Sequence, residues 1–137
     1  MDAVIQSFLS GLPILLLHFS LTIFMLGLGT IIYVFVTPYH EIELIKKGNS
    51  AAALSLSGAL IGMGIPLSVA MAGSVNAFDI LVYGAVALIL QLAAYRVTDF
   101  VLKGIPERIE NGEISAAITM VGIKISISLI NAAAVSV

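Results

Sequence analysis

The first long stretch of the chain, residues 3–39, contains no Asp, Glu, Lys or Arg. As a single α-helix it would extend about 55 Å, whereas the hydrocarbon core of a bilayer is about 30 Å thick. The stretch is therefore too long for one membrane span and too short for two. A charge-free segment of this length indicates an integral membrane protein with one span and an additional piece in this region.

Three further segments with little charge follow, and the composition agrees with this interpretation. Charged residues make up 10% of the chain, against about 25% in soluble domains. Four spans of about 20 residues would occupy most of the 137 positions and leave no room for a separate soluble domain. We therefore expect a single all-α membrane domain with four transmembrane helices, at about residues 12–36, 51–75, 77–101 and 114–135.

The residues before the first span have the pattern of an amphipathic helix. Between residues 2 and 12, apolar side chains at helical spacing lie opposite polar ones, which is typical of a helix in the membrane interface. Pro13 suits the first turn of a new helix. We predict a short N-terminal interfacial helix, with one continuous helix kinked at Pro13 as the alternative.

The ends of two other spans contain polar residues. Asn49 or Ser50 can cap the second span. The third span has too few uncharged residues to cross the bilayer alone, so we expect Arg96 and Asp99 in its last turns, at the level of the headgroups.

The chain resembles itself at an offset of 64 residues. The shared pattern is Glu-x-Ile-x-x-Gly-x-x-x-Ala-Ala, which starts at Glu43 and again at Glu107. In each copy, a short helical turn ends at a glycine that can adopt a positive φ. We expect a duplicated two-helix hairpin, with one repeat at about residues 12–75 and a parallel one at about 76–137. Repeats of the same orientation disfavour an inverted-repeat transporter within one chain.

The basic residues predict the orientation. Five of the six lie in or beside the two longer connections: Lys46, Lys47, Arg96, Lys103 and Arg108. Basic connections stay in the cytoplasm. We therefore expect both termini on the periplasmic or extracellular side.

Several segments, concentrated around the first connection, carry a resemblance to a known family. They are Thr37-Pro38-Tyr39-His40-Glu41, Leu44-Ile45-Lys46-Lys47-Gly48-Asn49-Ser50-Ala51-Ala52, Gly58-Ala59-Leu60-Ile61-Gly62, Ile65-Pro66-Leu67-Ser68, Gln91-Leu92 and Asn131-Ala132-Ala133. The chain resembles the YjfL-type family of bacterial inner-membrane proteins, domain-of-unknown-function family 350. The resemblance implies a bacterial inner membrane and four helices, but no activity, substrate or catalytic residue. At Lys124 it leads us to expect a small or apolar side chain instead.

Lys124 lies about 16 Å from the cytoplasmic end of its span, where a lysine costs about 2.5 to 3.5 kcal/mol. It should therefore face other helices, a subunit interface or a wet cavity. We expect no acidic residue at the same depth. One interpretation is a lysine satisfied by hydroxyls, amides or carbonyls, or deprotonated; the other is an anion-attracting or proton-linked site.

Three more polar residues lie within the spans. Gln91 and Asn131 need partners on other helices, so we interpret them mainly as structural contacts. His18 lies near the outer end of the first span, where it can titrate near neutral pH or bond a carbonyl. With Lys124, these residues form the candidate intramembrane polar site.

The cytoplasmic connections form a second candidate site. Its residues are Glu43, Lys46, Lys47, Glu107 and Arg108. They can dock a soluble partner or simply face water and headgroups. We find no catalytic arrangement, metal-ligand set or cofactor motif, and no charge pattern that predicts a nucleic-acid partner.

Two functions remain. The first is a non-enzymatic membrane subunit that forms homo-oligomers in the bilayer and docks a cytoplasmic or membrane protein. The alternative is a small oligomeric channel or transporter for an ion or small solute, with Lys124 among the polar residues of its path.

Overall fold

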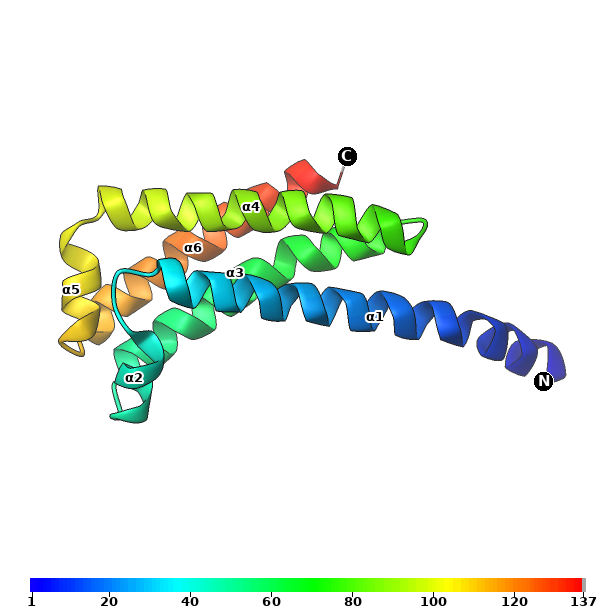
Figure 1. Ribbon diagram of the computed structural model, residues 1–137, viewed down its shortest axis with the longest axis horizontal. Helices are drawn as coiled ribbons and strands as arrows, with labels where there is room; N and C mark the ends of the chain where they lie inside the picture. Colours follow the sequence, from blue (N-terminus) through cyan, green and yellow to red (C-terminus); the bar gives the residue numbers. More distant parts are fainter. Residues whose placement is uncertain (137) are drawn as a thin grey trace.

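The computed structural model describes residues 1–136, and this part of the chain contains helices and no strands. Six helices follow one another: α1 (Asp2–Val36), α2 (Glu41–Lys46), α3 (Ser50–Ala72), α4 (Ala77–Val101), α5 (Gly104–Glu110) and α6 (Ile114–Val135). The four long helices, α1, α3, α4 and α6, are long and apolar enough to cross a membrane. The prediction of an all-α protein with four membrane-spanning helices is therefore confirmed. Figure 1 shows these four helices running side by side.

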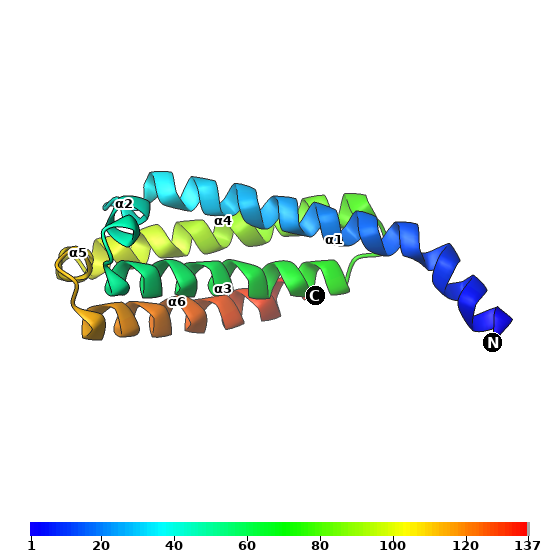
Figure 2. The same ribbon diagram turned by 90° about the horizontal axis from the view of Figure 1, so that it is seen from below.

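The α1 helix is continuous, which corrects the prediction of a separate N-terminal interfacial helix. It runs from Asp2 through Pro13 to Val36, as in the alternative interpretation. Proline removes one helical hydrogen bond, but in apolar surroundings the other backbone groups are best satisfied when the helix continues. Figure 2 shows the N-terminal part curving away and extending beyond the other long helices.

The short helices α2 and α5 lie at the same end of the bundle (Figure 1). Two residues after the end of each lies a glycine with positive φ, 88° at Gly48 and 84° at Gly112. The amide of Gly48 donates to Ile45, and that of Gly112 donates to Ile109, both at 2.9 Å. The glycine turn expected in both connections is therefore present. Duplication of the whole hairpin, with its two repeat ranges, remains a prediction.

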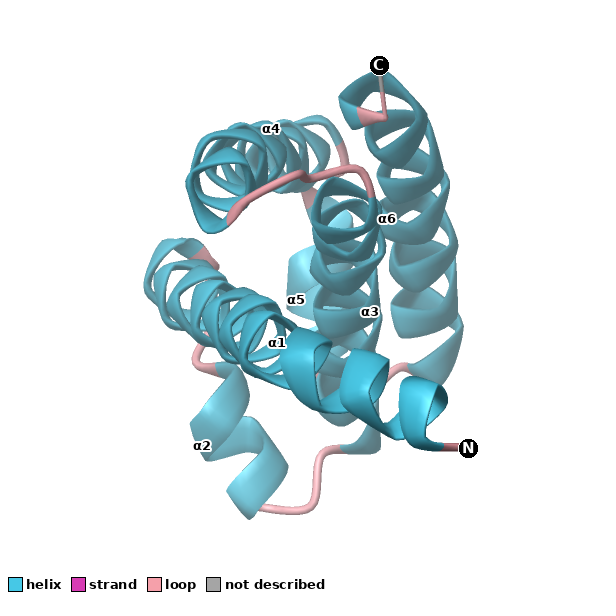
Figure 3. Cartoon of the chain, turned by 90° about the vertical axis from the view of Figure 1, so that its right-hand side faces the viewer, coloured by secondary structure: helices cyan, strands magenta, loops and turns pink. Residues whose placement is uncertain are grey.

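The α3 and α6 helices pack closely along each other (Figures 2 and 3). Buried alanines line the start of this interface: Ala51, Ala52, Ala116 and Ala117. Farther along, a Cβ on Gly58 would lie 2.5 Å from a methyl group of Val121. The small residues of α3 thus serve packing within the chain.

The α1 and α4 helices lie beside each other on the other side of the bundle (Figure 3). A Cβ on Gly29 of α1 would lie 2.8 Å from a methyl group of Leu88 in α4, so this glycine permits the close approach. Large apolar side chains such as Phe35 and Phe100 point outward and are exposed. Such a surface is stable when lipid surrounds it. Polar groups are found inside the bundle instead.

Candidate functional site

Lys124 of α6 is fully buried between the helices. Its Nζ donates to the hydroxyl of Tyr33 in α1 at 2.7 Å and lies 5.1 Å from the ring centre of Tyr95 in α4. Helix side chains lean toward the N-terminus of their helix. Because α6 begins at the α2–α5 end and α1 finishes there, Lys124 leans toward that end and Tyr33 leans inward. The two side chains therefore meet inside the bundle.

Glu41 continues this contact toward the end of the bundle. It lies in the first turn of α2 and is fully buried. Its Oε1 accepts a hydrogen bond from Tyr33 at 2.7 Å and a longer one from Ser55 at 3.4 Å. Tyr39 and Ser55 are linked in turn by a hydrogen bond of 2.8 Å between their hydroxyls. We call the chain Lys124–Tyr33–Glu41 the buried relay; it joins α6, α1 and α2.

The pKa of the Glu41 carboxyl is shifted by this environment. Burial raises the pKa of the Glu41 carboxyl, and the bond from Tyr33 and the charge of Lys124 oppose this only partly. Its second oxygen, Oε2, has no hydrogen-bond partner within residues 1–136. The relay therefore holds a basic and an acidic group in dry surroundings, with a phenol between them.

The sequence predicts no acidic residue at the depth of Lys124, and within residues 1–136 Lys124 has no carboxylate partner closer than 4.0 Å, but the charges of two buried carboxylates act on it. Glu41 lies outside the spans, so its position alone predicts a solvated cytoplasmic residue. In the structure, α2 directs its side chain into the bundle. Asp99 of α4 is also buried, and its charge acts on Lys124. One feature of the sequence indicates that Glu41 lies close to the bundle: it follows the end of α1 by only five positions.

Gln91 and Asn131 form a second polar contact, farther from the α2–α5 end of the bundle. The Nδ2 of Asn131 donates to the carbonyl of Ala87 and to Oε1 of Gln91, both at 3.0 Å. Gln91 in turn donates to the carbonyl of Lys124 at 3.4 Å. These bonds join α4 to α6, and contacts of this kind contribute about 0.6 to 2 kcal/mol. The structure thus brings together three of the four intramembrane candidates.

His18 is separate from them. It lies on α1, 15 positions before Tyr33, which corresponds to about 22 Å along the helix. Its side chain is half-buried. The structure does not bring His18 to the buried relay.

The candidate docking residues are all exposed on α2, α5 and the turn after α2: Glu43, Lys46, Lys47, Glu107 and Arg108. Asn49 fixes the two connections to each other, since its amide donates to the carbonyls of Ile109 and Glu110, both at 3.1 Å. Its Oδ1 also caps α3 by accepting from the amide of Ala52 at 3.0 Å. The two connections therefore form one surface, which we call the α2–α5 surface.

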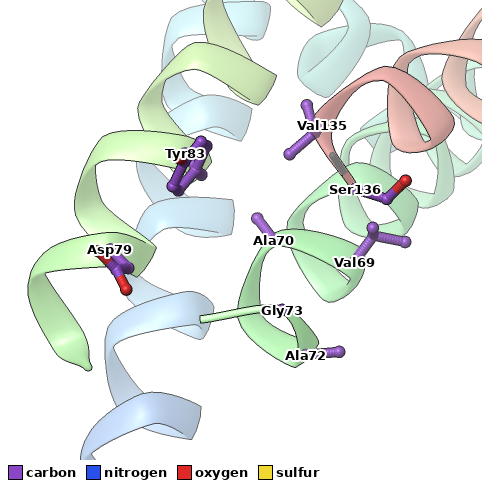
Figure 4. Close-up of a pocket in the computed structure, with 8 residues that line it drawn as sticks. All are labelled: Val69, Ala70, Ala72, Gly73, Asp79, Tyr83, Val135 and Ser136. Carbon is purple, nitrogen blue, oxygen red and sulfur yellow. The ribbon is translucent and has the colours of Figure 1, made fainter. Parts of the chain in front are cut away.

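A cavity of about 480 Å³ lies at the opposite end of the bundle (Figure 4). Asp79 and Tyr83 of α4, the end of α3 and the end of α6 line it. The carboxylate of Asp79 accepts a bond from the amide of Val75, so it already holds the α3–α4 turn. Within residues 1–136, no three His, Cys, Asp or Glu side chains are placed to hold a metal ion.

Comparison with known proteins assigns the chain to a family. Residues 7–135 match the family model described as Domain of Unknown Function (DUF350). The chain is also similar to an inner membrane protein named YjfL from Escherichia coli (strain K12), with 33% identity over 116 residues, or 85% of this chain and 88% of the relative. The protein of that name from Escherichia coli O157:H7 is equally similar. No solved structure matches.

Proposed function

The chain belongs to the family described as Domain of Unknown Function (DUF350), and from this premise we propose that it is a non-enzymatic, multi-pass subunit of the bacterial inner membrane. In this proposal the α2–α5 surface faces the cytoplasm and docks a protein partner, and the termini lie on the other side. The similar proteins from Escherichia coli are named inner membrane proteins, which supports a location in the bacterial inner membrane. The four apolar helices support the multi-pass arrangement.

One observation carries the docking proposal: the two connections are held as one surface and tied to the interior. Asn49 binds α5 through two carbonyls, and Glu41 ties α2 to the centre of the bundle through Tyr33. Flexible connections would need neither link. A surface whose backbone is already fixed loses less conformational entropy when a partner binds.

The charges of this surface are available to a partner. Within residues 1–136, the one ion pair closer than 4.0 Å joins Arg108 and Glu113. The remaining docking residues, Glu43, Lys46, Lys47 and Glu107, are exposed and make no such pair in that part of the chain. Unpaired surface charges of both signs steer and select a partner of complementary charge.

The test is photo-cross-linking in living cells from a reactive residue at Ile42, which is exposed on α2. We expect an adduct with a specific protein, reduced about tenfold by Glu43→Lys with Glu107→Lys. These changes add positive charge to the cytoplasmic side, so they preserve the predicted orientation. The matched control places the same reactive residue at Val75, in the turn at the opposite end. Adducts to lipid alone, or an adduct that the two substitutions leave unchanged, would refute docking here.

Self-association is the second part of the proposal. The α1 helix has the least buried surface of the four long helices, and its apolar outer face is available to another copy within the bilayer. The mass of the protein in nanodiscs at several lipid-to-protein ratios tests this. A multiple of the 14.3 kDa chain mass is expected. A single-chain mass at every ratio would contradict it.

The alternative, a channel with Lys124 in its path, has less support. The ammonium group is enclosed by Tyr33 and Tyr95 within one chain, so a path along it requires the bundle to open. We expect no ion flux through wild-type protein in reconstituted vesicles. A flux that Lys124→Met changes would favour the alternative instead.

A further inference from the structure

Two hollows follow each other along the seam between α1 and α4. The first is an apolar groove of about 270 Å³, lined on α1 by residues that include Leu28 and Ile32, and on α4 by residues that include Ala85, Leu88 and Leu92. It opens on the outer side of the bundle, where lipid lies. A groove of this chemistry fits a hydrocarbon chain.

The second hollow is a charged pocket of about 320 Å³ at the α5 end of the same seam. Its charged lining residues are Arg96, Asp99, Lys103, Glu107 and Glu110, and Pro38 after α1 closes one side. Two cations and three carboxylates thus share one pocket. None of them is in an ion pair closer than 4.0 Å within residues 1–136.

The groove and the pocket lie on one face of α4. Leu81, Ala85, Leu88, Leu92, Arg96 and Asp99 follow each other at intervals of three or four residues, which places them on one side of a helix. This face is apolar as far as Leu92 and charged from Arg96, one turn later. The apolar part, from Leu81 to Leu92, extends about 16 Å, close to half of the hydrocarbon core of about 30 Å.

We propose that this seam binds one phospholipid with a phosphoethanolamine headgroup, from the leaflet on the α2–α5 side. One acyl chain lies in the α1–α4 groove. The phosphate binds Arg96 and Lys103, and the ammonium group binds the carboxylates of Glu107 and Glu110. The site shares Glu107 with the α2–α5 surface, but it does not rest on the docking proposal, because neither the groove nor the pocket requires a protein partner.

The charges of the pocket select this headgroup. A purely anionic headgroup would meet two cations but also three carboxylates, of which Asp99 is buried. A choline headgroup carries the right charges, but its quaternary ammonium has no N–H to donate. A primary ammonium has three N–H donors, as in lysine, and its hydrogen bonds to carboxylates are the stronger, charge-assisted kind.

The experiment is native mass spectrometry of the delipidated, full-length protein in detergent. Phosphatidylethanolamine, phosphatidylglycerol and phosphatidylcholine with identical acyl chains are added in separate titrations. We expect one phosphatidylethanolamine per chain, bound about tenfold more tightly than the other two, which corresponds to one additional charged hydrogen bond. Glycerophosphoethanolamine, which lacks acyl chains, should bind far more weakly.

Two pairs of variants separate the parts of the site. Glu107→Gln with Glu110→Gln removes the acceptors of the ammonium group and should abolish the preference for ethanolamine, whereas Glu43→Gln with Glu113→Gln, an equal charge change at exposed positions outside the pocket, should keep it. Ala85→Phe fills the groove and should weaken all three lipids alike. Ala93→Phe, at an exposed position of α4 outside the groove, should not. The melting temperature Tm of each variant confirms folding.

Several results would overturn the proposal. Equal retention of the three lipids, or tightest binding of phosphatidylglycerol, contradicts the headgroup assignment in the wild-type protein alone. Equal binding of glycerophosphoethanolamine contradicts a membrane lipid as the source of the headgroup. The same loss of preference in the Glu43 and Glu113 control removes the pocket from the argument.

Discussion

The Nζ of Lys124 and the hydroxyl of Tyr33 are 2.7 Å apart, although 91 positions separate the two residues in the sequence. The contact joins the first and the last long helix. Because Tyr33 also donates to Glu41, it extends the link to α2, outside the spans. A single phenol therefore connects the interior of the bundle to the α2–α5 surface. Breaking the link should affect both stability and the position of α2.

We expect Lys124→Met to destabilise the protein by about 2 kcal/mol, because the Tyr33 hydroxyl loses a charged donor and Glu41 loses the nearby cation. Adding Glu41→Gln should recover part of this loss, since the double variant leaves no buried charge in the relay. Thermal unfolding of the single and double variants in the same detergent measures the coupling between the two residues. Strictly additive effects would show that they are not coupled.

The matched control for this cycle is Lys46→Met. Lys46 is exposed on α2, so the substitution removes the same charge without opening the interior. Its Tm should stay close to that of the wild-type protein. Hydrogen exchange adds a local measurement: the amides of α2 should exchange faster in Lys124→Met than in the control.

The stability of the protein should fall as the pH rises above the ordinary pKa of a glutamate, about 4.5. Burial raises the pKa of Glu41, so the folded state binds more protons than the unfolded state in this range. Its contribution is then complete at low pH and is lost as the pH rises through the raised pKa. Glu41→Gln cannot titrate, and its Tm should depend less on pH. Glu43→Gln, at an exposed position of the same helix, should keep the wild-type dependence. An unchanged slope in Glu41→Gln would contradict this origin.

Hydropathy and charge predict the four long helices well, because each span has to be apolar and long enough to cross the hydrocarbon core by itself. The four apolar segments with little charge correspond to α1, α3, α4 and α6. The glycine turns at Gly48 and Gly112 and the cap at Asn49 are also readable, because they depend on a few neighbouring residues. The continuity of α1 through Pro13 does not follow from the sequence, since a proline is compatible both with the start of a new helix and with a kink in a continuous one.

The buried relay could not be predicted in this way. Its three members come from a span, a connection and another span, and their contact depends on how the helices pack. The position of Lys124 on its helix predicts its depth and a side chain that faces other helices, a subunit interface or a wet cavity, but it does not identify Tyr33 as the partner. Glu41 looked like any acidic residue in a cytoplasmic connection. Only the fold of α2 against the bundle distinguishes it from Glu43.

Gly62 should be far less tolerant of alanine than Gly64, two positions later on the same helix. A Cβ at Gly62 would overlap the hydroxyl of Tyr95, whereas one at Gly64 would meet nothing within 4 Å. Tyr95 cannot easily move, because its hydroxyl donates to the carbonyl of Ala59 at 3.0 Å. We expect Gly62→Ala to cost about 2 kcal/mol through overpacking. Gly64→Ala should be neutral or stabilising by up to about 1 kcal/mol. Equal Tm values for the two variants would contradict the close approach of α3 and α4.

The chain contains no cysteine, so single cysteines can test the predicted orientation directly. Val75 lies exposed in the α3–α4 turn, and Glu43 lies exposed on α2 at the opposite end. The basic residues predict that the α2 end lies in the cytoplasm. A membrane-impermeant maleimide should therefore label Val75→Cys in intact spheroplasts and Glu43→Cys only after the membrane is opened. Lysed spheroplasts, in which both should react, control for reactivity. Labelling of Glu43→Cys in intact spheroplasts would show the opposite orientation. The α2–α5 surface would then lie on the outer side of the membrane, where no cytoplasmic partner could reach it.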